Sequence, residues 1–379
     1  MKALINKISQ QYLIFTNILY VFNKKFKFLF YSEDKTYQKY SYNIIRILSK
    51  RYPNQVFYTS SDPNDKIKNL NVKNIFVGDG FFAKLFFLIL KAEYFFLTLT
   101  DLDNHSLKKT KNVKKYIYYF HAPVSTFKNY TETAFDNYDI ILCNGPNHIT
   151  EIRKREKLKN LKEKKLIKTG YFYFDYLSEN ISLNIKPNKV LVAPSWNYDC
   201  ENFINENFVR IIDTLLKKKF FVIFRPHPEH FKRSKNILEN IRFTHKDSNL
   251  FHFDETNENI NSMEKSKCLI TDASGISIEY LFLTKRPVLY LNDIDKVHNK
   301  DFLNYSNIDS IDSLVKNNFG YNFYIKDIDK IDLVIDDAIK NLNTKIPLLS
   351  SFVSDNFFNF GSTKKNFDLI IESQILNNK

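Results

Sequence analysis

The clearest signal of the fold lies in residues 267–292, KCLITDASGISIEYLFLTKRPVLYLN. An apolar run ends at Thr271 and Asp272, a tight Ala-Ser-Gly turn follows, and a stretch of helix length leads to a second apolar run from Pro287. A strand, a helix and another strand in this order predict a βαβ unit of a parallel sheet. Both apolar runs are almost uninterrupted, which is typical of strands that are covered on both faces.

The same alternation extends outward over the rest of the chain. It predicts further strands at 26–32, 55–60, 74–79, 94–100, 116–120, 139–144, 189–194, 220–226 and 249–254. It also predicts helices at 36–51, 80–92, 146–160, 201–219, 232–240, 257–266, 275–284 and 328–343 and, after Pro347, at about 362–376. We therefore expect an α/β protein with two doubly wound, Rossmann-like domains that face each other across a cleft.

A polar stretch, NISLNIKPN at 180–188, marks the expected change of domain. We expect a first domain over residues 1–183 and a second over 184–350. A C-terminal segment, 351–379, is expected to place its helix back against the first domain.

Charge is distributed unevenly between the two halves. Residues 1–185 contain 30 Lys and Arg against 16 Asp and Glu, whereas residues 186–379 contain 26 of each. The basic half predicts an anionic partner, such as a membrane face, a phosphate polymer or nucleic acid. The densest basic run, 151–168, has nine Lys and Arg against three Glu. It fits either a solvated helix face or contact with an anionic surface.

Composition excludes several classes of protein. A chain that is 44% hydrophobic and 26% charged is not disordered overall. Three cysteines are too few for a disulfide scaffold and lack metal-ligand spacing, which favours a reducing, cytoplasmic location. The apolar stretch 11–22 is shorter than the roughly 20 residues of a membrane span, and no signal-peptide cleavage site follows it. It fits either a buried first element or a helix lying on a membrane surface.

The turn after Asp272 is the first candidate binding site. A strand–turn–helix presents backbone N–H groups and the positive end of a helix dipole, as a diphosphate requires. Ser274 and Gly275 allow close approach, and Ser277 would add a donor. Glu279, one turn into the helix, would accept hydrogen bonds from ribose or polyol hydroxyls. The alternative is an ordinary helix cap formed by Asp272 or Ser274.

Two histidines follow predicted strands and are the candidate catalytic residues. The segment FFVIFRPHPEH, 220–230, places Arg225 and His227 where they would neutralise phosphate charge; His230 is expected at the surface with the two basic residues that follow. The segment KKYIYYFHAPVSTFK, 114–128, places His121 in the same way. If the two histidines face each other across the cleft, one is suited to take a proton from an attacking hydroxyl.

These motifs together resemble one known family. The segments YFHAPVS, TGYFYFD (169–175), VAPSW (192–196), FRPHP and ITDASGISIEYLFLTKRPVLY are similar, in order and spacing, to motifs of the CDP-glycerol glycerophosphotransferases, the teichoic-acid-type polymerases and primases. The resemblance covers about residues 115–292. The stretch DNFFNFGS, 355–362, echoes the family's C-terminal segment.

The resemblance implies a fold of the glycosyltransferase-B (GT-B) type, with a CDP-linked donor in the second domain and an acceptor in the first. It also implies peripheral attachment to the inner face of the plasma membrane. By residue, it implies that His121 is the base and that His227 acts on the donor phosphates. It further implies a donor site formed by Thr271, Asp272, Ser274, Gly275, Pro194, Ser195 and Trp196.

The sequence also departs from the family pattern. It has Phe-His-Ala for Trp-His-Gly around His121, Phe-Tyr for Pro-Arg after Tyr171, Ala-Ser-Gly for Tyr-Ser-Ser in the donor loop, and Asn197 for Arg after Trp196. These positions are expected near the donor. The donor is therefore a CDP-linked polyol or, as the alternative, a nucleotide sugar.

We expect a transferase that moves a polyol phosphate, such as glycerol phosphate, from a CDP-linked donor to a hydroxyl of a cell-surface glycan or polymer and releases CMP. No carboxylate cluster or cofactor motif is apparent, so neither a metal nor a cofactor is expected. His121 is the expected base, and Asp272 is the other candidate. One alternative is a sugar transferase of the same fold in capsule, lipooligosaccharide or other surface polysaccharide synthesis. A nucleic-acid-binding protein is another, but no nucleic-acid-binding motif supports it.

Overall fold

The computed structural model describes residues 2–105, 107–196, 206–292, 296–305 and 307–376. The chain forms two compact units. One consists of Met1–His121, Thr131–Tyr176 and Phe357–Lys379, and the other consists of Ala122–Tyr130 and Leu177–Asn356. The chain passes from the first unit to the second within a helix, α6 (Phe172–Asn180), slightly before the polar stretch in which the sequence placed the boundary.

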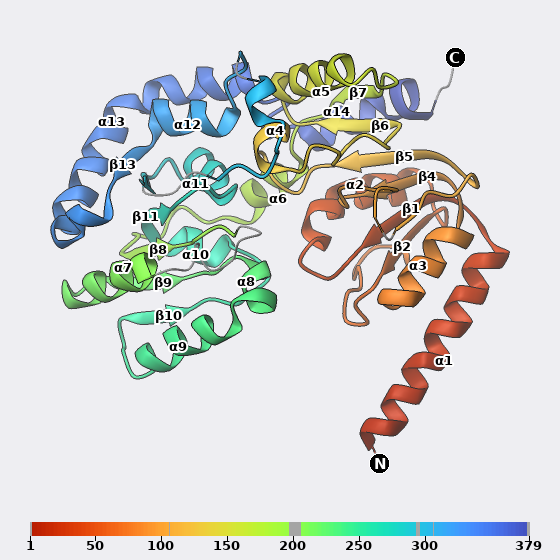
Figure 1. Ribbon diagram of the computed structural model, residues 1–379, viewed down its shortest axis with the longest axis horizontal. Helices are drawn as coiled ribbons and strands as arrows, with labels where there is room; N and C mark the ends of the chain where they lie inside the picture. Colours follow the sequence, from red (N-terminus) through yellow and green to blue (C-terminus); the bar gives the residue numbers. More distant parts are fainter. Residues whose placement is uncertain (1, 106, 197–205, 293–295, 306, 377–379) are drawn as a thin grey trace. The chain divides into compact units, whose positions relative to one another are not determined.

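The first unit contains a seven-stranded parallel sheet in the order β3-β2-β1-β4-β5-β6-β7 (Figure 1). Its strands are β1 (Lys25–Ser32), β2 (Val56–Ser60), β3 (Lys73–Phe76), β4 (Lys91–Leu97), β5 (Val113–Tyr119), β6 (Ile140–Cys143) and β7 (Lys165–Lys168). Its helices are α1 (Lys2–Asn23), α2 (Gln38–Arg51), α3 (Gly80–Ile89), α5 (Pro146–Leu158) and α14 (Thr363–Ile370), which continues as a π-helix over Ile371–Leu376. The central strands are buried because their apolar side chains point to both faces.

The second unit contains a six-stranded sheet in the order β10-β9-β8-β11-β12-β13, also with parallel pairing. Its strands are β8 (Lys189–Val192), β9 (Phe221–Phe224), β10 (Phe251–Phe253), β11 (Ser266–Thr271), β12 (Val288–Leu291) and β13 (Tyr321–Phe323). Its α-helices are α4 (Thr126–Asn129), α7 (Glu206–Lys217), α8 (Pro228–Arg233), α9 (Lys235–His245), α10 (Ile260–Lys265), α11 (Ile276–Thr284), α12 (Ile311–Phe319) and α13 (Ile331–Asn356). Short 3-10 helices span Phe302–Tyr305 and Ile325–Lys330.

Both strand orders reverse direction once, between β1 and β4 in the first sheet and between β8 and β11 in the second. In open parallel sheets a ligand crevice lies at this point, beyond the carboxyl ends of the strands. The expected α/β class with two doubly wound sheets is confirmed. The reversal in the second sheet puts the loops after β8 and β11 side by side.

Several elements were not anticipated, among them strands β7 and β13 and helix α12. The edge strands β7 (KLIK) and β13 (YNF) are short and partly exposed, so they lack the apolar runs by which the others were found. Helix α13 continues through Pro347 to Asn356, whereas the predicted helix ended at residue 343. Burial of Leu342, Leu349 and Val353 on either side of Pro347 holds this part of the helix in place.

The C-terminal segment packs on the first unit through the TGYFYFD motif. Gly170 has a φ of +96°, and a Cβ there would lie 2.2 Å from the carbonyl oxygen of Phe358. Asp175 accepts hydrogen bonds from the backbone N–H groups of Thr363 (3.2 Å) and Lys364 (2.9 Å) at the start of α14. The glycine and the aspartate of this motif therefore have structural roles within the unit.

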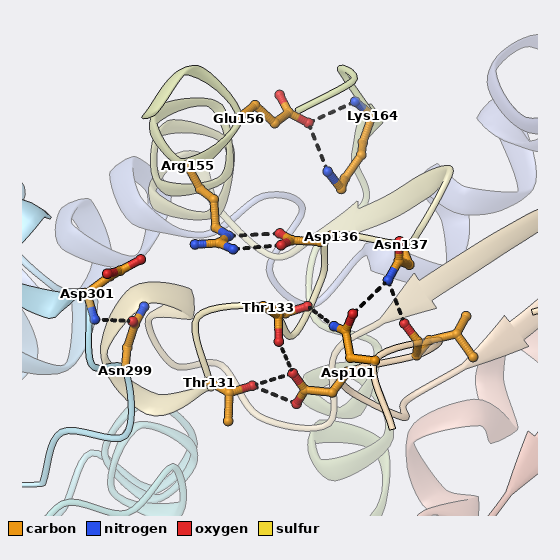
Figure 2. Close-up of polar contacts among 12 residues, drawn as sticks. Asp101, Thr131, Thr133, Asp136, Asn137, Arg155, Glu156, Lys164, Asn299 and Asp301 are labelled. Carbon is orange, nitrogen blue, oxygen red and sulfur yellow. Dashed lines mark hydrogen bonds and ion pairs between the residues drawn. The ribbon is translucent and has the colours of Figure 1, made fainter. Parts of the chain in front are cut away.

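Two basic residues of the run 151–168 are paired with carboxylates inside the unit, as Figure 2 shows. The guanidinium of Arg155 donates to both carboxylate oxygens of Asp136, at 2.8 and 2.6 Å. The buried ammonium of Lys164 lies 3.6 Å from the carboxylate of Glu156, which is itself buried. These cations stabilise the fold and are not available to an external partner.

Replacing Glu156 by Ala should lower the free energy of unfolding by about 3–5 kcal/mol, because it leaves the buried Lys164 without its counter-ion. Burial already lowers the pKa of Lys164, and Glu156 opposes that effect. The matched control is Glu163→Ala, which removes an exposed carboxylate 3.8 Å from Arg153 and should cost about 0–1 kcal/mol. Denaturant unfolding of both variants checks this, and equal losses would contradict it.

Candidate active site

The loops after β8 and β11 are tied together by Asp272. One of its carboxylate oxygens accepts from the backbone N–H of Ser195 at 2.8 Å, and the other accepts from the Ser195 hydroxyl at 2.8 Å. The hydroxyl of Thr271 donates to the carbonyl oxygen of Ala193 at 2.7 Å. Asp272, Ser195 and Thr271 are all buried, so these three predicted donor-site residues hold the two loops at the reversal of strand order.

The turn after Asp272 leads directly into α11. Gly275, just before the helix, has ordinary right-handed backbone angles, so its glycine is not required by conformation. A Cβ there would instead lie 3.3 Å from Ala122 Cβ and 3.4 Å from Val124 Cγ1. Ser277 donates both its N–H (3.0 Å) and its hydroxyl (2.7 Å) to the carbonyl oxygen of Ser274. Gly275 thus lets the segment that follows His121 in the chain approach the start of α11.

Two predicted donor-site residues are engaged within the second unit. Arg225 donates to the carboxylate of Asp254 at 2.7 Å and to the carbonyl oxygen of Thr256 at 2.9 Å. Burial acts to raise the pKa of Asp254, but Arg225 and neighbouring hydroxyl donors outweigh it, and the pKa is lowered. Glu279 is buried and accepts from the side-chain amide of Asn259 at 3.0 Å.

His227 lies at the start of helix α8. Its Nδ1 accepts from the backbone N–H of Glu229 at 3.2 Å. In the neutral ring the proton is therefore on Nε2, which makes Nε2 a hydrogen-bond donor. The imidazole is half-buried, and its centroid lies 5.9 Å from the ring of Trp196.

Trp196 is the centre of a cluster of nitrogen-bearing side chains. Its ring lies 5.4 Å from the centroid of His298, 5.4 Å from the guanidinium carbon of Arg233 and 5.7 Å from the ammonium of Lys296. With His227, these residues form what we call the Trp196 cluster. It lies next to the loops after β8 and β11, which the hydrogen bonds of Asp272 link. Lys296 and His298 were missed in the sequence, where they appear only as part of a polar run after β12.

The expectation that His230 is exposed is wrong. Its ring is fully buried, with Nε2 2.7 Å from the carbonyl oxygen of Ser195 and Nδ1 3.2 Å from the hydroxyl of Ser234. Three residues after His227, almost one helical turn, the chain of α8 directs this side chain inward beneath the β8 loop. Burial lowers the pKa of His230, which keeps the ring neutral. Lys232 and Arg233 are exposed, as expected.

His121 follows β5 in the first unit. Its ring lies edge-on to Tyr37, at 5.6 Å between centroids, and 6.1 Å from the ring of Tyr40. The backbone carbonyl of His121 accepts from the hydroxyl of Tyr171 at 3.1 Å, which ties it to the TGYFYFD motif. Burial lowers the pKa of His121 to about 4, so the imidazole is neutral at neutral pH and can accept a proton.

Within the ranges that the structure describes, no three His, Cys, Asp or Glu side chains are grouped so that they would hold a metal ion.

The two Rossmann-like units define the chain as a protein of the GT-B type, the architecture that its structural neighbours share. Residues 13–311 match the family model described as CDP-Glycerol:Poly(glycerophosphate) glycerophosphotransferase. Because this match covers most of the chain, the protein belongs to that family. The resemblance stated from its motifs is therefore confirmed, and the chain is a glycerophosphotransferase-like enzyme.

Solved structures support the same fold at low sequence identity. The wall teichoic acid polymerase TagF matches with a TM-score of 0.62 at 17% identity, over 92% of this chain and 89% of that one. A putative UDP-N-acetylglucosamine 2-epimerase from Listeria monocytogenes matches with a TM-score of 0.58 at 9% identity, over 92% and 96%. The UDP-GlcNAc 2-epimerase from Methanocaldococcus jannaschii, in complex with UDP-GlcNAc and UDP, gives 0.53 at 14%, over 92% and 100%. None of the curated proteins matches the sequence.

Proposed function

We propose that the protein transfers a polyol phosphate, such as glycerol phosphate, from a CDP-linked donor to a hydroxyl of a cell-surface glycan or polymer, with release of CMP. Membership of the glycerophosphotransferase family supports the reaction class. The observation that carries the assignment within the molecule is the Trp196 cluster, because it gathers cationic and hydrogen-bonding groups at the reversal of strand order. This is where a nucleoside diphosphate is expected in such a sheet.

His121 is proposed as the base and His227 as the donor to phosphate. The acceptor oxygen bonds to the β-phosphorus of the donor, the bond from that phosphorus to the bridging oxygen breaks, and CMP leaves with the electron pair. The hydroxyl proton passes to His121, whose neutral ring can accept it. The Nε2–H of His227 and the start of α11 donate to the phosphate oxygens as their charge increases.

We assign Asp272 a positioning role. Both of its carboxylate oxygens accept from Ser195, so the geometry favours His121 as the base. Arg225 is proposed to act in the same indirect way, through the Asp254 loop beyond β10. Thr271, Ser274, Gly275, Ser277, Glu279 and Trp196 remain proposed as the walls and backbone donors of the donor site.

The donor assignment is tested by calorimetric titration of the purified protein with CDP, CMP, UDP and GDP. The proposal predicts binding of CDP and CMP, with UDP and GDP bound at least about tenfold more weakly. Preferential binding of UDP or GDP would support the alternative of sugar transfer in surface polysaccharide synthesis. Absence of binding to all four would contradict the donor site itself.

We further propose peripheral attachment to the inner face of the membrane through α1. One face of α1 carries an apolar stripe whose members recur every three or four positions and are each at least 46% exposed. They are Ile8, Tyr12, Phe15, Leu19 and Phe22. Ile14, Ile18 and Val21 on another face of α1 are buried against the unit. Lys91 borders the stripe, since its ammonium lies 5.0 Å from the ring of Phe22, and Lys73 lies 3.6 Å from the ring of Tyr20 on the same helix. This combination suits an anionic lipid surface.

Among the described helices, none is both long enough and apolar enough to cross a bilayer. Substituting Tyr12, Phe15 and Leu19 together by Ser should reduce binding to vesicles of mixed neutral and anionic lipid at least about tenfold, because it removes exposed apolar surface that the bilayer would cover. Co-sedimentation measures this. The control replaces Phe243 and Leu303, which are 69% and 82% exposed in the second unit. Equal binding by both variants would contradict the assignment.

A further inference from the structure

Lys296 is the most deeply buried member of the Trp196 cluster. Only 6% of the residue is exposed, and its ammonium lies 5.7 Å from the centre of the Trp196 ring. It follows β12, the neighbour of β11 in the sheet, so it approaches the predicted donor site from a segment that the motifs do not include. The sequence alone gave it no role.

The ammonium has no contacting counter-ion. Within the part of the chain that the structure describes, no carboxylate lies within 4.0 Å of it and no acceptor forms a hydrogen bond with it. Two more distant carboxylates, those of Asp272 and Asp312, act on the ammonium electrostatically. Asp272 accepts hydrogen bonds from Ser195, and Asp312 accepts one from the backbone N–H of Ser125 at 2.9 Å. A buried ammonium without a contacting counter-ion is costly, and such groups are concentrated at functional sites.

We propose that Lys296 binds the diphosphate of the nucleotide-linked donor by direct contact of its ammonium with phosphate oxygen. This assignment rests on the proposed function, and it makes Lys296 the phosphate-binding cation of the proposed donor site. The rings of His227 and His298 both lie within 6 Å of the Trp196 ring and supply hydrogen-bonding nitrogens. Arg233 lies on the solvent side, since its side chain is 42% exposed, and its guanidinium also pairs with the carboxylate of Glu229 at 3.0 Å.

The groups around Lys296 predict that the affinity for a diphosphate depends on pH. Burial lowers its pKa to about 8, although Asp272 and Asp312 oppose the shift. The charges of His298 and His230 do not change over this range, since burial lowers the pKa of His298 to about 3 and also lowers that of His230. Arg233 stays charged. Diphosphate affinity should therefore fall as pH rises from 7.5 to 9.5, as Lys296 loses its proton.

The test compares Lys296→Met and Lys296→Arg with wild type by calorimetric titration with CDP, CMP and cytidine. Lys296→Met should weaken CDP binding about 10- to 100-fold, because a charge-assisted hydrogen bond is lost. Cytidine, which has no phosphate, should bind unchanged. Lys296→Arg should retain most of the CDP affinity and remove its fall between pH 7.5 and 9.5.

Lys300→Met is the matched control, because Lys300 is exposed and only four residues away; it should bind CDP as wild type does. Lys296→Met should also melt at an equal or higher temperature, since a lysine with a lowered pKa destabilises the fold while it is protonated. Equal CDP affinity in wild type and Lys296→Met, or an equal loss for CDP and cytidine, would overturn this inference alone. If wild type binds neither CDP nor CMP, the proposed function itself fails.

Discussion

Replacing His121 by Ala is expected to lower turnover by about 10²- to 10⁴-fold, the usual contribution of a general base. Donor affinity should remain within a few-fold of wild type, because the proposed donor site lies in the second unit and His121 in the first. The exposed His105 of the same unit provides the control, and His105→Ala should leave turnover unchanged. Turnover of His121→Ala near the wild-type level would exclude this residue as the base.

The pH profile provides a second check on His121. A base must be deprotonated to act, and burial lowers the pKa of His121 to about 4. Loss of kcat/KM on acidification should therefore occur near pH 4 to 5 and not near the usual histidine value of about 6.5. If kcat/KM instead falls near pH 6.5 on acidification, the base is a more exposed group than His121.

His227 provides the second large expected effect. His227→Ala should lower turnover about 10²- to 10³-fold, because a hydrogen bond to the developing phosphate charge is removed. This residue also caps α8, and loss of the cap alone should cost about 1 kcal/mol of stability. The two roles must be measured separately.

His227→Asn separates them. Asparagine is among the best helix-capping residues, so this variant should melt near wild type while turnover stays low. His252→Ala, at an exposed position on β10, is the matched control and should affect neither property. Recovery of turnover in His227→Asn would show that capping is the main contribution of the histidine and would contradict its proposed contact with phosphate.

The fold was largely predictable because the central strands are continuous apolar runs. Strands such as β1 and β11 are buried on both faces, and that burial is visible directly in the sequence. Strands β7 and β13 lack this signal, because they are short and their residues are partly exposed. The assignment of residues 122–130 to the second unit was not foreseen, since their contact with Gly275 joins positions far apart in the chain.

The candidate site was predictable where residues lie directly at strand ends. Thr271, Asp272 and Ser195 come together because β8 and β11 are neighbours, and adjacent parallel strands end at the same edge of the sheet. Lys296 was not predictable, because no motif includes it and its approach to Trp196 depends on tertiary packing. The ion pair of Arg225 with Asp254 could not be predicted from the sequence either, since it depends on β9 and β10 being neighbours.

The most direct test of the central claim is the identity of the released nucleotide. The protein is incubated with CDP-glycerol and a glycerol-phosphate oligomer as acceptor, and nucleotides are separated by ion-exchange chromatography, with His121→Ala as the blank. The account predicts CMP in a one-to-one ratio with glycerol phosphate added to the acceptor. Absence of CMP with CDP-glycerol, together with release of UDP or GDP from a nucleotide sugar and transfer of that sugar, would contradict it.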